Sequence, residues 1–105
     1  MPPPEIDVHQ LAHLHRSGAA ILDVRHPGEW AEVRVPGVPL IPLSELTDRV
    51  EEVPAGEPLY VICAVGGRSA KAAELLRALG VDAVNVAGGT RGWVEAGYPI
   101  ESGPG

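Results

Sequence analysis

Short apolar runs alternate with helix-favouring segments along this chain, and that alternation restricts its fold more than any other feature. Strands are predicted at residues 20–24, 40–41, 59–62 and within 81–86. The first of these has too many consecutive apolar residues for a half-exposed strand, so it is expected to be buried. Helices are predicted over residues 8–15, 28–33, 43–50, 70–79 and 90–96. Strands joined by helices over short connections predict an α/β fold, with a mostly parallel sheet of about five short strands and helices on both faces.

Capping and helix-breaking residues place the ends of these elements. Asp7 is a suitable N-cap for the first helix, Pro27 suits the first turn of the second, and Gly80 ends the fourth. The fourth helix has an apolar stripe at i, i+3, i+4 and i+7, made of Ala72, Leu75, Leu76 and Leu79. Residues 1–4 are expected to be an extended lead-in and residues 101–105 a flexible tail, so that residues 1–105 form one domain.

Composition narrows the classes of function. The 105 residues carry a formal net charge of −6, which argues against a nucleic-acid partner because such proteins present a basic face. No apolar run approaches the ~20 residues of a membrane helix, and the first residues lack the features of a signal peptide. A cytoplasmic monomer without a membrane partner is therefore expected. The single cysteine rules out an internal disulfide and a two-cysteine redox pair.

That cysteine, Cys63, follows the apolar run 59–62 and stands just before a glycine-bearing turn and a predicted helix. In parallel α/β sheets, ligands bind beyond the carboxyl ends of the strands, which is where this order places Cys63. The dipole of the following helix is worth at most ~2 kcal/mol, or about 1.5 pKa units, so a strongly activated thiol needs further donors. The turn supplies them as backbone N–H groups of the residues after the cysteine: Ala64, Val65, Gly66, Gly67, Arg68 and Ser69.

These features lead to the hypothesis that Cys63 is a nucleophile, largely thiolate near neutral pH. The glycines give the backbone the freedom to let the N–H groups converge, and Arg68 could add a guanidinium. Two interpretations of Arg68 stay open: an inward side chain that binds an anion, or a solvated side chain whose backbone N–H is the useful part. The alternative for Cys63 is a small buried hydrophobic residue, which would not require the glycines and the Arg-Ser pair that follow it.

Other polar residues have a structural interpretation beside the functional one. Asp23 and Arg25 flank the end of the first main strand, where an internal ion pair is favoured over catalysis, although Arg25 and His26 are candidates to line the pocket. His9 and His13 stand at i, i+4 on one helix, a spacing that can bind zinc. No cysteine or carboxylate completes such a set, so a solvated helix face is favoured and no metal is expected.

Six segments together make the chain resemble a single-domain rhodanese, a sulfurtransferase homology domain, over nearly its whole length. They are LDVRHPGEW (22–30), VPG (35–37), IPL (41–43), CAVGGRS (63–69), GGTRGW (88–93) and GYP (97–99). The resemblance implies that Cys63 takes a sulfane sulfur from an anionic donor such as thiosulfate and holds it as a persulfide. The acceptor would be cyanide, a thiol or a sulfur-carrier protein. Residues 64–69 would bind the donor and cradle the persulfide, with no metal or organic cofactor.

The chain departs from the family pattern at Arg34, which stands where the family usually has a histidine of structural role. Thiosulfate is favoured over mercaptopyruvate as the donor. A cysteine-dependent phosphatase or arsenate reductase is the competitor within the superfamily, but those enzymes have five residues between cysteine and arginine. Here four residues separate Cys63 from Arg68, and none of them is acidic. The alternative from another class is a non-catalytic or relay module that docks on a partner protein.

Overall fold

A computed structural model describes residues 2–104. Its sheet has four parallel strands in the order β1-β4-β3-β2. Their bounds are Glu5–Ile6 for β1, Ala20–Asp23 for β2, Leu59–Ile62 for β3 and Ala83–Val86 for β4. The predicted parallel α/β fold is confirmed. The strand expected at residues 40–41 is reduced to one isolated bridge between Leu40 and Asp23, because Pro39 and Pro42 on either side cannot donate to a ladder.

The helices follow the predicted order. They are α1 (Val8–Arg16), α2 (Pro27–Glu32), α3 (Gly67–Ala78) and α4 (Gly89–Glu95). Asp7 caps α1, since its side chain accepts a hydrogen bond from the Gln10 N–H. The helix predicted over residues 43–50 forms as two 3₁₀ helices, η1 (Leu43–Glu45) and η2 (Thr47–Glu52), and not as one α-helix. Leu43 and Leu46 both pack on the core, and a spacing of three aligns them on one side of a 3₁₀ turn.

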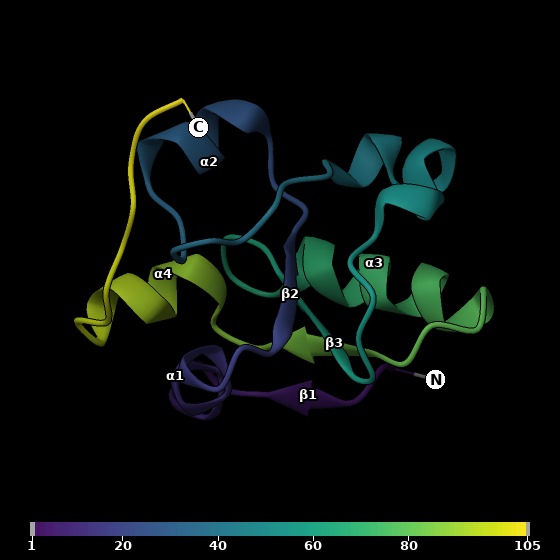
Figure 1. The fold of residues 1–105 in the computed structure, drawn as a ribbon, viewed down its shortest axis with the longest axis horizontal. Coiled ribbons are helices and arrows are strands. Elements are labelled where there is room, and N and C mark those ends of the chain that lie inside the picture. Colours follow the sequence, from purple (N-terminus) through teal and green to yellow (C-terminus); the bar gives the residue numbers. More distant parts are fainter. Residues whose placement is uncertain (1, 105) are drawn as a thin grey trace.

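Helices cover both faces of the sheet, as predicted. Figure 1 shows α1 and α4 together on the left of the molecule, with α3 and the two 3₁₀ helices on the right. The buried strand β3 serves both layers, because successive side chains point to opposite faces. Tyr60 and Ile62 belong to the core cluster that includes α1 and α4. Leu59, Val61 and Cys63 belong to the cluster that includes α3, so Cys63 leaves the sheet on the α3 side.

Both ends of the described chain are hydrogen-bonded to the domain. Glu5 and Ile6 form β1, which the sequence did not indicate, and the Asn85 N–H donates to the Pro4 carbonyl. The segment 101–104, expected to be part of a flexible tail, lies against α2 and the residues after it: the Gly103 N–H donates to the Ala31 carbonyl at 2.7 Å, and Arg34 and Glu101 form an antiparallel bridge. Met1 and Gly105, the outer ends of the expected lead-in and tail, lie outside the described residues.

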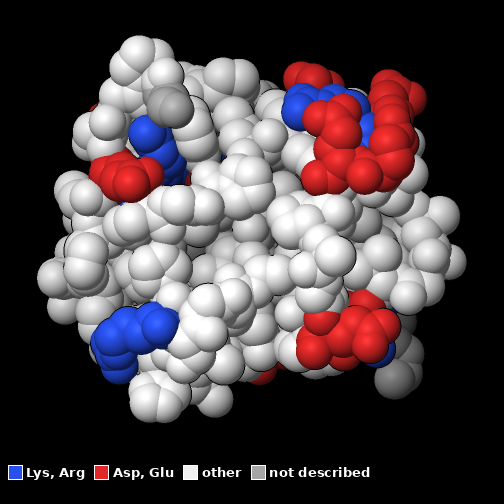
Figure 2. Space-filling view, in the orientation of Figure 1, with Lys and Arg blue, Asp and Glu red and all other residues white. Residues whose placement is uncertain are grey.

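The surface seen in Figure 2 is mostly uncharged, with acidic side chains gathered over η1 and η2. Within that group Arg49 pairs with Glu45 and Glu52 at 2.9 Å each, so its charge is compensated locally. None of the helices between residues 2 and 104 combines the length and the apolarity that crossing a bilayer requires.

Gly89, at the start of α4, lets that helix approach the end of β3 closely. The Thr90 and Arg91 N–H groups donate to the carbonyls of Cys63 and Ala64 at 2.8 and 3.0 Å. Gly89 has φ +57°, and a Cβ there would lie 2.6 Å from the Ala64 carbonyl carbon and oxygen. A side chain at this position would therefore push α4 away from the residues that follow β3.

We expect Gly89→Ala to destabilise the protein more than Gly97→Ala does. Both positions have positive φ, which costs an L-residue roughly 1–2 kcal/mol, but Gly97 has open space around a Cβ while Gly89 faces backbone atoms. The clash should add about 1–3 kcal/mol to the loss in free energy of unfolding, measured by urea denaturation. Equal losses in the two variants would contradict the close approach.

Candidate active site

Cys63 lies directly beyond the carboxyl end of β3, at the entrance of a tight turn into α3. The turn closes at Gly66, which has φ +110° and is the N-cap of α3. The Cys63 Sγ accepts a hydrogen bond from the Gly66 N–H at 3.1 Å and another from the Ser69 hydroxyl at 3.2 Å. Because a φ this positive is favourable only for glycine, the sequence of the turn itself directs these donors onto the sulfur.

Hydrogen bonds oppose burial in setting the acidity of the thiol. Burial raises the pKa of Cys63, while the Ser69 hydroxyl and the backbone N–H groups of Ser69, Gly66 and Val65 lower it. The donors outweigh burial, so the pKa lies below its ordinary value. Cys63 itself is 1% exposed, whereas Val65 at the tip of the turn is 59% exposed.

The Arg68 side chain joins α3 to α2. Its two terminal nitrogens donate to the two carboxylate oxygens of Glu29 at 2.7 and 2.9 Å, a bidentate pair. The hydrogen bond from Arg68 is the main reason that the pKa of Glu29 falls to about 2. Both side chains are about one third exposed. The guanidinium is thus neither free in solvent nor turned to the Cys63 sulfur, but held by Glu29.

Arg25 is the partner of Asp23 in a buried ion pair, as the sequence favoured. The closest atoms are 2.8 Å apart, and both side chains are almost fully buried. Arg25 also donates to the Val33 carbonyl at 2.7 Å, so its guanidinium holds α2 and the following turn instead of lining an open pocket. His26 is exposed and is the N-cap of α2, and its backbone N–H donates to the Glu29 side chain.

Asn85 is a site residue that the sequence analysis missed. It is 1% exposed in β4, and its Oδ1 lies 2.5 Å from the Ser69 hydroxyl oxygen, so it is a second acceptor, beside the Cys63 sulfur, for the one hydrogen of that hydroxyl. Its Nδ2 donates to Glu5 at 2.8 Å and to the Gly66 carbonyl at 3.3 Å. One signal was available: a polar residue between apolar neighbours in a buried strand needs a hydrogen-bond partner.

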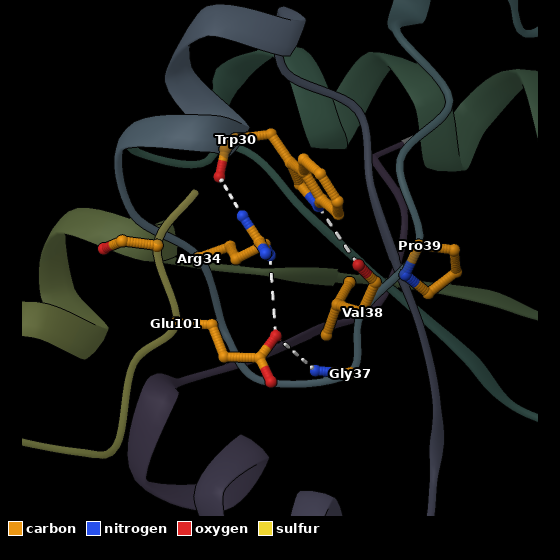
Figure 3. Close-up of a pocket in the computed structure, with 7 residues that line it drawn as sticks. Trp30, Arg34, Gly37, Val38, Pro39 and Glu101 are labelled. Carbon is orange, nitrogen blue, oxygen red and sulfur yellow. Dashed lines mark hydrogen bonds and ion pairs between the residues drawn. The ribbon is translucent and has the colours of Figure 1, made fainter. Parts of the chain in front are cut away.

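A separate cavity of about 500 Å³ lies beside α2. Figure 3 shows Arg34 within it, next to the Trp30 ring, with Glu101 facing Arg34 and Gly37. The Arg34 guanidinium lies 3.8 Å from the centre of the Trp30 ring and donates to the Trp30 carbonyl at 3.0 Å. No residue of the turn 63–69 lines this cavity. These contacts give Arg34 a structural role in this part of the chain.

The Glu29–Arg68 pair should make stability depend on pH. The pKa of Glu29 is lowered in the folded state, so the pair stabilises the protein above the ordinary value of 4.5 and loses this effect as the pH falls towards 2. Relative to wild type, Glu29→Gln should lose up to about 1 kcal/mol at neutral pH, since the pair is partly exposed, and progressively less below pH ~4.5. Urea denaturation at several pH values measures this difference.

Glu74→Gln is the control, because Glu74 is an exposed residue of α3 with no ion pair within residues 2–104. Its free energy of unfolding should follow that of wild type at every pH. A loss in Glu29→Gln that stays constant down to pH ~2 would show that the ion pair is not its cause.

Comparison with known proteins agrees with this geometry. A family model of the rhodanese-like domain matches residues 7–96. The chain is 34% identical to the thiosulfate:glutathione sulfurtransferase of Homo sapiens, in a match covering 88% of this chain and 94% of that protein. It is 40% identical to YrkF of Bacillus subtilis over 70% of this chain and 40% of YrkF.

The solved structures lead to the same family. A rhodanese-related protein from Thermoplasma volcanium superposes with a TM-score of 0.85 at 36% identity, over 93% of this chain and 97% of that one. Three bacterial relatives, YrkF among them, are longer, and the match spans 40–60% of their length. With a family match over most of its residues and the expected cysteine turn in place, the chain belongs to the rhodanese-like domain family.

Proposed function

We propose that this domain moves a sulfane sulfur from thiosulfate, or a similar anionic donor, to a thiophilic acceptor through a persulfide on Cys63. The observation that carries the proposal is the convergence of donors on the Cys63 sulfur, from the Gly66 N–H at 3.1 Å and the Ser69 hydroxyl at 3.2 Å. Such donors stabilise a thiolate, which is the nucleophilic form of cysteine.

In the first half of the reaction the Cys63 thiolate attacks the outer sulfur of thiosulfate. A new sulfur–sulfur bond forms, the bond within thiosulfate breaks, and sulfite leaves with the electron pair. The product is a persulfide whose negative charge lies on the outer sulfur. In the second half the acceptor attacks that outer sulfur, and Cys63 leaves as thiolate. With cyanide as the acceptor the product is thiocyanate, and the atoms and charges balance without a cofactor.

The dimensions of the turn suit a sulfur atom better than a phosphoryl group. Four residues separate Cys63 from Arg68, and none has a carboxylate to act as general acid. The N–H groups of the turn point at the sulfur itself. In the persulfide they would face the charge on the outer sulfur, as preorganised donors that need no movement during the reaction.

The relatives support the proposed donor and acceptor classes. The human relative, which matches over 94% of its length, is named as a thiosulfate:glutathione sulfurtransferase, so its name pairs this donor with a thiol acceptor. We therefore propose thiosulfate as the donor of this domain and a thiol, or a sulfur-carrier protein, as the acceptor in the cell.

Thiocyanate formation from thiosulfate and cyanide tests the proposal. Wild type should form thiocyanate and Cys63→Ala should form none, because the only cysteine of the chain carries the sulfur. Circular dichroism and urea denaturation of Cys63→Ala check that it is folded. Thiocyanate formation by a folded Cys63→Ala protein would overturn the persulfide mechanism.

If wild type forms no thiocyanate, a second measurement distinguishes the two remaining candidate functions, a sulfur relay and a docking module. Intact-mass measurement after incubation with thiosulfate, then with mercaptopyruvate, shows whether the protein gains one sulfur atom. A gain indicates a relay that does not deliver to cyanide. No gain from either donor favours the docking module over sulfur transfer.

Arg68→Ala, compared with the double variant Glu29→Gln/Arg68→Ala, tests how Arg68 contributes. Loss of Arg68 alone leaves the Glu29 carboxylate unpaired near the turn, where it should repel the anionic donor and raise KM for thiosulfate about fivefold, or ~1 kcal/mol. The double variant restores the local net charge, so its KM should return towards wild type. A KM that stays equally high in both variants would show that Arg68 binds the donor directly.

A further inference from the structure

A chain of buried hydrogen bonds leads from the Cys63 sulfur across α3, β4 and β1. The Ser69 hydroxyl lies 3.2 Å from the Cys63 Sγ and 2.5 Å from the Asn85 Oδ1. Ser69 is fully buried and Asn85 is 1% exposed, so water does not replace either contact freely. Beyond Asn85, this series of hydrogen bonds ends at the exposed side chain of Glu5.

The partners of Asn85 determine which way its amide is oriented. The Glu5 carboxylate and the Gly66 carbonyl, at 2.8 and 3.3 Å, only accept hydrogen bonds, so the amide nitrogen must face them. The amide oxygen then faces Ser69. The Ser69 hydroxyl has one hydrogen and two acceptors within reach, the Asn85 Oδ1 and the Cys63 sulfur.

We propose that Asn85 is a positioning residue that competes with the Cys63 sulfur for the single hydroxyl hydrogen of Ser69 and thereby favours the states in which that sulfur is uncharged. When Cys63 is a thiolate, the hydrogen turns to the sulfur, and two oxygens 2.5 Å apart are left without a hydrogen between them. When Cys63 is a thiol, the hydrogen turns to Asn85, and the thiol can donate its own hydrogen to Ser69.

The persulfide is a second uncharged state of the same sulfur, and this step rests on the proposed function. In a persulfide the negative charge lies on the outer sulfur, so the Cys63 Sγ is a weak acceptor. The Ser69 hydrogen then turns to Asn85. Asn85 would therefore stabilise the sulfur-loaded form relative to the free thiolate, and slow the loss of sulfur until an acceptor arrives.

The charged groups around the turn are not placed to produce the change in the charge state of the Cys63 sulfur that we assign to Asn85. Glu5 on β1 lies behind Asn85, and Arg68 on α3 is paired with Glu29 of α2. The Asp23–Arg25 pair at the end of β2 is buried, and its two charges compensate each other. Neutralising Glu5 as Glu5→Gln keeps an amide oxygen to accept from Asn85, so it tests charge while leaving the hydrogen-bond chain in place.

The experiment is the pH dependence of Cys63 alkylation by iodoacetamide in the full chain, which has no other cysteine. Ser69→Ala should raise the midpoint of the profile, because it removes a donor to the thiolate. Asn85→Leu should lower the midpoint by about half a pH unit, because it removes the competing acceptor. In Ser69→Ala/Asn85→Leu the midpoint should equal that of Ser69→Ala alone, and Glu5→Gln should resemble wild type.

An upward shift in Asn85→Leu would overturn the proposal, because it would mean that Asn85 only holds Ser69 in place. An equal downward shift with and without Ser69 would also overturn it, as would a Glu5→Gln midpoint that matches Asn85→Leu. Asn85→Val, with a side chain suited to a buried strand, replaces Asn85→Leu if that variant does not fold, and the same shifts are expected from it.

The alkylation profile is recorded without added sulfur donor. It therefore tests the role of Asn85 even if the protein proves not to transfer sulfur. A second measurement tests the persulfide step: after loading with thiosulfate, Asn85→Leu should lose its added sulfur to buffer faster than wild type, as followed by intact mass. Equal loss would remove the persulfide part of the proposal, while thiocyanate formation by wild type would still stand.

Discussion

The hydrogen bond from the Thr90 N–H to the Cys63 carbonyl, at 2.8 Å, decides how the central strand leaves the sheet. It fixes the peptide of Cys63 against the start of α4, with Gly89 allowing the approach. With the carbonyl held on that side, the Cys63 side chain belongs to the core cluster on the α3 side. There the Gly66 N–H and the Ser69 hydroxyl reach the sulfur. One backbone contact thus orients the nucleophile, and the turn then surrounds it.

The electrostatics of the site come from the backbone and one hydroxyl more than from charged side chains. The two arginines that the sequence offered as candidates for the site are engaged elsewhere, Arg25 with Asp23 and Arg68 with Glu29. The Ser69 hydroxyl and the N–H groups of the turn nevertheless keep the pKa of Cys63 below its ordinary value. Such a turn is compatible with the proposed anionic donor even in a protein with a net charge of −6. The acidity of Cys63 therefore depends more on the shape of the turn, which Gly66 sets, than on charged side chains at the surface.

The same arrangement connects stability to the site. The Glu29–Arg68 pair holds α2, as does Arg25 of the Asp23–Arg25 pair, which donates to the Glu29 carbonyl, and the segment 101–104 lies against α2 through the Gly103 N–H and the Ala31 carbonyl. The helix that carries Glu29 is therefore anchored from three directions: the end of β2, the start of α3 and the C-terminal segment. Since Arg68 belongs to the first turn of α3, whatever holds α2 also restrains the turn that surrounds the sulfur.

The order of β2, β3, β4 and the four α-helices was determined by the sequence itself, because apolar runs, caps and glycines are local signals. Residues 59–62 form a strand with the predicted bounds, and Asp7 caps the first helix as expected. Cys63 was identified as the candidate nucleophile by its place between a strand and a glycine turn. The four-residue spacing to Arg68 and the absence of an acid within it were equally visible in the sequence.

Only the tertiary structure decided which distant residues meet. Glu5 and Ile6 form a strand because β4 offers them a free edge, a contact with no local pattern. In α3, Ala72 and Leu76 are buried as the stripe predicted, but Leu75 and Leu79 are exposed and Ser69 and Ala73 are buried instead. Arg68 turns to Glu29, and Ser69 meets Asn85 sixteen positions further along. Side-chain hydrogen bonds of this kind depend on how strands and helices are placed in space, and neither periodicity nor spacing in the sequence specifies that placement.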